Sequence, residues 1–142
     1  MNRLDDEVQK CAKRVVKMSR DRGHDVLDYT DASIELVEEM LAEAAAHATR
    51  MTEDAVRRLA QDVGCYILEV ARRNHGGVFD WAADRNEPSL IITGPQISIT
   101  LFCWDKVRER LREGGATNVA AFYADYVERL KQAKPGDRIV FL

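Results

Sequence analysis

The side chains best suited to nucleophilic chemistry are three cysteines and three histidines. Cys65 and His75 are the pair we consider first, because a thiol beside an imidazole base can act as a nucleophile. Ten residues along one helix separate two groups by about 15 Å, so this pair would meet only if the chain folds back after Asn74. Free cysteines are also often buried. We therefore expect a structural thiol and assign no catalytic residue.

The same residue types could bind a metal, but their spacing does not favour it. The chain has no CxxC pair, and its histidines and cysteines lack the i, i+3 or i, i+4 spacing of helical metal ligands. The residues concerned are His24, His47, His75, Cys11, Cys65 and Cys103. We expect neither a metal site nor a cofactor, and we expect free thiols in a reducing cytoplasm.

Glu69 is the carboxylate with the most informative position. It lies between Leu68 and Val70 within an apolar pattern, and a buried carboxylate needs a partner. Arg72 and Arg73 follow at helical spacing and can supply an ion pair. The alternative is that Glu69 lines a cleft near the turn after His75. The glycines of that turn follow a helix, so they are typical of a C-terminal cap rather than a phosphate-binding loop.

Two further features would suit contact with another protein. The first feature is an acidic helix face, which we interpret either as a docking surface for a basic partner or as an ordinary solvated face. It contains Glu35 and Glu39, together with Glu38 and Glu43. The aromatic residues Trp81, Phe102 and Trp104 are either core residues or interface residues, since exposed tryptophan is common at binding hot spots.

Helical periodicity dominates the first half of the chain and returns at its end. Apolar residues at steps of three and four predict helices over residues 3–22, from Thr30 to about residue 48, and from Thr52 to about Asn74. Gly64 indicates a close helix crossing. Two more helices are predicted, one from Asp105 and one from residues 117–118. Residues 26, 27 and 29 are expected to dock on the core.

The middle third changes to a period of two. Residues 78–82, 89–93 and 96–100 read as short strands with short connections, which favours an antiparallel meander. The predicted fold is α+β: N-terminal helices, a three-stranded antiparallel meander in the middle and two C-terminal helices. Residues 1–142 form one domain, with 1–23 as a dimerisation or packing arm. The apolar residues 139–142 could form an edge strand, dock on the core or bind another chain.

Composition excludes several classes of protein. The chain has 142 residues, 46% hydrophobic residues and a net charge of −3. Mild acidity argues against a nucleic-acid binder, which needs a basic surface. No apolar run approaches the length of a membrane span, and no secretory signal opens the chain. We therefore expect a cytoplasmic protein.

Two stretches resemble a family of uncharacterised bacterial proteins, domains of unknown function. The first is Leu27-Asp28-Tyr29-Thr30-Asp31-Ala32-Ser33, and the second runs from Gly64-Cys65-Tyr66-Ile67-Leu68-Glu69 through Gly76-Gly77 to Trp81. They are similar to an "LDYS…S" opening and a "G.YLGE…GG.W" centre, with Thr30, Cys65 and Leu68 as departures. The likeness covers roughly residues 26–127, and it carries over no catalytic residue.

These observations favour a non-enzymatic protein that acts through protein–protein contacts, as an adaptor or immunity-like protein, with a protein partner or by self-association. The alternative is a small-molecule-binding protein or small enzyme. Its cleft would lie between sheet and helices, where Glu69, His75, Trp81 and Trp104 would converge. A dimer built on the first helix is a third hypothesis.

Overall fold

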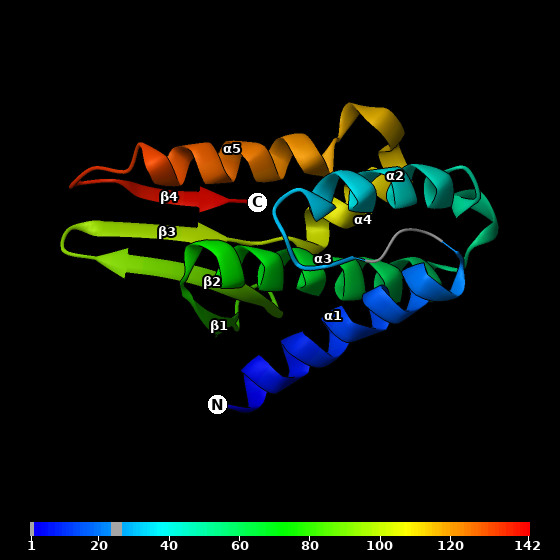
Figure 1. The fold of residues 1–142 in the computed structure, drawn as a ribbon, viewed down its shortest axis with the longest axis horizontal. Helices are drawn as coiled ribbons and strands as arrows, with labels where there is room; N and C mark the ends of the chain where they lie inside the picture. Colours follow the sequence, from blue (N-terminus) through cyan, green and yellow to red (C-terminus); the bar gives the residue numbers. More distant parts are fainter. Residues whose placement is uncertain (1, 24–26) are drawn as a thin grey trace.

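The computed structural model describes residues 2–23 and 27–142, which fold into helices around one mixed sheet (Figure 1). The helices of this part are α1 (Arg3–Asp21), α2 (Ser33–Ala45), α3 (Glu53–His75), α4 (Trp104–Glu113) and α5 (Val119–Lys131), with short 3₁₀ turns η1 (Ala48–Arg50) and η2 (Gly114–Ala116). The strands are β1 (Val78–Ala82), β2 (Glu87–Gly94), β3 (Ile97–Leu101) and β4 (Arg138–Phe141). The predicted α+β class is confirmed.

α1 lies along α3 as a packing arm. Its first turn is capped by Asn2, whose side chain accepts a hydrogen bond of 2.9 Å from the Asp5 N–H. Val8, Ala12 and Val15 are buried in the core of this same chain. The apolar stripe that would have built a helix dimer is therefore used within the chain.

α3 is the central helix of the fold. Thr52 caps it by accepting a 3.0 Å hydrogen bond from the Ala55 N–H, and every residue from 63 to 71 is buried. The helix ends at His75 and Gly76 caps it with a φ of +87°, which suits glycine, so the predicted C-terminal cap is confirmed. At Gly64 an added Cβ would lie 2.6 Å from Cδ1 of Trp104, which confirms the predicted close crossing.

The sheet corrects the predicted meander in one respect. β1, β2 and β3 pair antiparallel as expected, but β4 adds a fourth strand parallel to β3, with Ile99 opposite Ile139. Parallel neighbours need a long crossover connection, which α4 and α5 supply. Of the three possibilities left open for residues 139–142, the edge strand is the one observed, and it runs from 138 to 141.

The two faces of the sheet differ in what covers them. One row across the strands contains Phe79, Leu90, Leu101 and Phe141 and packs in the core. The opposite face carries the row Val78, Ile91, Thr100 and Val140, in which both valines are exposed. At these rows, therefore, the helices pack against the first face and not against the opposite one.

The connection into α2 docks as predicted where it is described. Leu27 is buried and Tyr29 is half-buried with a φ of +65°. Residue 26, predicted to dock beside them, lies outside the described residues. Thr30 was expected to cap this helix, but α2 begins at Ser33 with Ala32 as its N-cap and has no side-chain cap. The Thr30 hydroxyl instead accepts a 3.2 Å hydrogen bond from the Ser33 N–H and so stabilises the turn before the helix.

Candidate functional site

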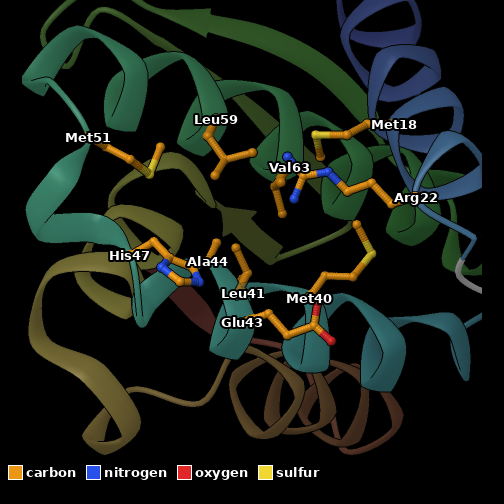
Figure 2. Close-up of a pocket in the computed structure, with 10 residues that line it drawn as sticks. All are labelled: Met18, Arg22, Met40, Leu41, Glu43, Ala44, His47, Met51, Leu59 and Val63. Atoms are coloured by element: carbon orange, nitrogen blue, oxygen red, sulfur yellow. The ribbon is translucent and has the colours of Figure 1, made fainter.

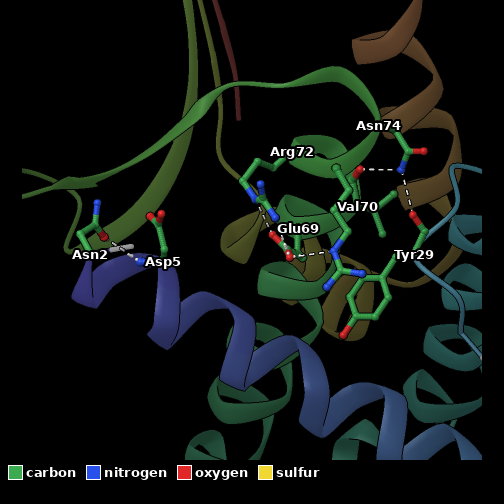
Figure 3. Close-up of polar contacts among 8 residues, drawn as sticks. Asn2, Asp5, Tyr29, Glu69, Val70, Arg72 and Asn74 are labelled. Carbon is green, nitrogen blue, oxygen red and sulfur yellow. Dashed lines mark hydrogen bonds and ion pairs between the residues drawn. The ribbon is translucent and has the colours of Figure 1, made fainter.

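Glu69 forms a buried ion pair, the simpler of its two predicted roles. Its carboxylate is fully buried and accepts hydrogen bonds from Arg72 at 2.7 and 3.0 Å and from Arg73 at 2.8 Å (Figure 3). Burial alone raises the pKa of Glu69, but the hydrogen bonds and positive charges of the two arginines outweigh it and hold that pKa below its usual value. Glu69 is therefore a stable carboxylate without a free proton to exchange.

The arginine side of this ion pair reaches the loop before α2. The Arg73 guanidinium stacks over the Tyr29 ring at 3.7 Å. The Asn74 amide donates a 2.8 Å hydrogen bond to the Tyr29 carbonyl (Figure 3). Tyr66 accepts a 3.0 Å hydrogen bond from the Tyr29 N–H. The two stretches that carry the sequence resemblance are thus in contact, and these contacts join the loop before α2 to α3.

His75 belongs to a second polar cluster. Its Nε2 lies 2.8 Å from Oδ2 of Asp31, whose Oδ1 accepts a 2.5 Å hydrogen bond from the Tyr123 hydroxyl. Burial and the Asp31 carboxylate raise the pKa of Tyr123, so the phenol remains the donor. This cluster connects the loop before α2 to the end of α3 and to the first half of α5. Sequence analysis missed Asp31 and Tyr123 as partners of His75.

The two tryptophans come together beside the helices. Their rings pack edge to face, with centroids 6.3 Å apart and planes at 77°. They line a cavity of about 820 Å³ between α1, α3 and the start of β2. Its other lining residues are Arg3, Leu4, Glu7, Val8, Cys11, Arg14, Gln61, Cys65 and Pro88. Neither Glu69 nor His75 lines this cavity, so the four predicted cleft residues form three separate groups.

Two cysteines border the same cavity. Cys65 is buried, as expected, whereas Cys11 is only half-buried. The Arg14 guanidinium donates a 2.9 Å hydrogen bond to the Cys11 Sγ, and Asp62 holds the same guanidinium at 3.1 Å. Cys11 stands on the edge of the α1 stripe with Arg14 one turn on, a local signal that could have identified it.

A smaller cavity of about 390 Å³ lies between α1, α2 and α3. Figure 2 shows Met18, Met40 and Met51 around it, with Arg22 and His47 among its polar residues. Methionine side chains are flexible and fill irregular spaces in cores. This cavity contains neither tryptophan nor cysteine, so we regard it as the weaker candidate.

The remaining predicted site residues lie on separate surfaces. Phe102 is buried, with the Arg85 guanidinium 4.7 Å from its ring centre. Glu35 and Glu39 are exposed on α2, whereas Glu38 turns inward and pairs with the buried Arg110 at 2.8 Å. The acidic face of α2 is therefore narrower than the sequence indicated.

Comparison with known proteins assigns the chain to no family. No family model matches the chain, and no match was found among curated proteins or solved structures. Within residues 2–23 and 27–142, no cluster of three or more histidine, cysteine, aspartate or glutamate side chains could hold a metal ion. None of the described helices combines the length and apolar character needed to cross a membrane.

Proposed function

We propose that this chain is a cytoplasmic small-molecule-binding protein whose site is the cavity between α1, α3 and the sheet. The observation that carries the proposal is the joint placement of Trp81 and Trp104 on a cavity of about 820 Å³. Ligand sites are typically concave, largely apolar spaces of about 300–1,000 Å³ with a few polar groups that fix orientation. The proposal assigns no catalytic step.

The lining indicates the chemistry of the ligand. Trp81, Trp104 and Pro88 offer apolar and aromatic surface to a planar organic group. Arg3 lines the cavity and has no ion-pair partner among the described residues, so it can meet an anionic group. The ligand class that fits best is a planar apolar molecule with an anionic group.

A fluorescence titration with the anionic dye anilinonaphthalene sulfonate tests the proposal. Both tryptophans of the chain line this cavity, so tryptophan emission reports on it directly. We expect saturable energy transfer from tryptophan to the dye at micromolar to millimolar concentrations, with weaker dye binding in Trp81→Ala.

Met40→Gln changes the smaller cavity and is the matched control, which should bind the dye like the wild type. Dye binding that is abolished by Met40→Gln and unaffected by Trp81→Ala would contradict the proposal. It would place the ligand in the methionine-lined space.

A second candidate function, contact with a protein partner, is supported by the outer face of the sheet. Val78 and Val140 are 67% and 57% exposed and belong to one row across the four strands. Exposed β-branched residues on an uncovered sheet face suit a protein interface. We expect Val78→Asp and Val140→Asp to abolish self-association or partner capture in light scattering and pull-down. Unchanged association would exclude this face.

A further inference from the structure

Cys11 and Cys65 form a pair across the α1–α3 interface. The two residues are 54 positions apart in the sequence, yet the packing of α1 along α3 brings both side chains to one cavity, where each thiol shifts the pKa of the other. Both line the tryptophan cavity, with Cys11 half-buried and Cys65 buried. A disulfide needs two sulfurs that can approach to about 2 Å with Cβ atoms close together. The shared cavity and the interaction between the two thiols make Cys11 and Cys65 the cysteine pair to test for such a bond.

The surroundings of Cys11 favour its thiolate. Arg14 donates a 2.9 Å hydrogen bond to the Sγ, and the ion pair of Arg14 with Asp62 orients the guanidinium. A hydrogen bond from Cys65 and the positive charge of Arg14 lower the pKa of Cys11, against the opposing effect of partial burial. Reactive cysteines typically lie in such electropositive and partly exposed positions.

The surroundings of Cys65 favour the neutral thiol. The hydrogen bond with Cys11 and burial raise the pKa of Cys65, while the Trp104 indole N–H donates to its Sγ at 3.4 Å. The pair therefore consists of a half-buried thiol with a lowered pKa at the cavity and a buried neutral thiol behind it. Cys103 provides the contrast, because it is buried outside this cavity and burial raises its pKa.

We propose that Cys11 and Cys65 are a reactive dithiol that reduces a small hydroperoxide and closes to a disulfide between α1 and α3. The inference rests on the proposed function in one respect, since the cavity must admit a small molecule to Cys11. The oxidant is an organic hydroperoxide or hydrogen peroxide, and a small dithiol restores the reduced pair.

The reaction proceeds in two steps. The Cys11 thiolate attacks the terminal peroxide oxygen, the O–O bond breaks, and Cys11 becomes a sulfenic acid. The alkoxide or hydroxide that leaves takes a proton from solvent water and departs as an alcohol or water. Cys65 then attacks the Cys11 sulfur, the S–S bond forms, and the S–O oxygen leaves as water with the Cys65 proton. Two electrons pass from the two thiols to the peroxide. Oxidation of Cys11 removes the thiolate that raises the pKa of Cys65, so the second step is favoured by the first.

Peptide mapping of the folded protein after brief treatment with hydrogen peroxide tests the proposal. We expect a disulfide that joins Cys11 to Cys65, reversal by dithiothreitol, and an unmodified Cys103 as the internal control. In Cys65→Ser, Cys11 should accumulate as a sulfenic acid that dimedone traps. Arg14→Gln should slow oxidation of Cys11 by about tenfold because its thiolate fraction falls, whereas Arg14→Lys should retain most of the rate.

Two outcomes would overturn the proposal. One is oxidation of Cys11 no faster than that of free cysteine and unaffected by Arg14→Gln, a change at a largely exposed side chain that should leave folding intact. The other is a sulfenic acid on Cys11 that never closes on Cys65. Dye binding and peroxide oxidation, both measured on the wild-type protein, separate this proposal from the proposed function. Binding without peroxide reactivity refutes the dithiol alone, and peroxide reactivity without binding refutes the ligand site alone.

Discussion

Replacement of Glu69 by glutamine would measure how much the buried ion pair of α3 stabilises the fold. The carboxylate accepts three charge-assisted hydrogen bonds from Arg72 and Arg73, and glutamine keeps the shape but loses the charge. Its amide N–H₂ would face guanidinium donors, so part of the network is lost rather than replaced.

The expected loss of unfolding free energy follows from how far each side chain of the ion pair is buried. A hydrogen bond to a charged group contributes a net free energy of about 1.5–3 kcal/mol when its groups are buried. The Arg72 and Arg73 side chains are 33% and 43% exposed, so they regain water and much of that energy is recovered. We expect Glu69→Gln to lower the free energy of unfolding by about 2 kcal/mol at neutral pH, within the range found when one partner of a partly buried pair is removed.

The pH dependence gives this prediction a second readout. The folded-state pKa of Glu69 lies below its usual value, so its stabilisation is present above the unfolded-state pKa and is lost as pH falls through the folded-state pKa. Urea unfolding of wild type and variant should therefore differ most near neutral pH and converge in acid. Glu35→Gln, at an exposed position on α2, is the control and should change stability by less than about 0.5 kcal/mol. If the difference in free energy of unfolding between wild type and Glu69→Gln stays constant or widens in acid, the reasoning is wrong.

Three further substitutions test other parts of the structure. Gly64→Ala gains helix propensity but forces a Cβ against Trp104. Thermal unfolding should therefore show a net loss of stability of about 1–3 kcal/mol, and tryptophan emission should shift. A stabilised variant would contradict the close crossing of α3 and α4 at Gly64. Glu87→Gln should stabilise the protein at pH 7 more than at pH 4 in urea titrations, because burial and a neighbouring negative charge raise the pKa of Glu87. The wild type loses stability as pH rises from the unfolded-state pKa of Glu87 toward its folded-state pKa, and glutamine avoids this loss. Equal effects of the substitution at both pH values would contradict this prediction. Tyr123→Phe leaves one oxygen of Asp31 without its 2.5 Å hydrogen bond and should cost about 1–2 kcal/mol by chemical denaturation, whereas an unchanged midpoint would show that the bond contributes nothing.

The parts of the fold that depend on local spacing could be predicted from the sequence. The periodicity of α1 and α3 and the cap at Thr52 are local patterns, and so is the pairing of Glu69 with arginines three and four residues on. The strand β4 could not be assigned, because four apolar residues at the chain end fit several environments and parallel pairing depends on a distant partner.

Contacts between distant positions explain what the sequence did not reveal about the site. His75 meets Asp31 across 44 positions, and Cys11 meets Cys65 only because α1 lies along α3 in one particular orientation. The tryptophans were expected beside Glu69 and His75, but β1 and the start of α4 carry them to a cavity that neither residue lines. Nothing in the spacing of the tryptophans signals this placement. Helix packing therefore decides which residues share the cavity.

The most direct test of the ligand cavity is an NMR titration that follows the two tryptophan indole N–H signals. Trp81 and Trp104 are the two tryptophans of the chain, so the indole region contains one signal from each. Addition of planar anionic fragments should shift both signals together, with saturation and with little change at amides around Met40. Fragments that bind while both indole signals stay fixed, or that shift only amides around the smaller cavity, would contradict the account.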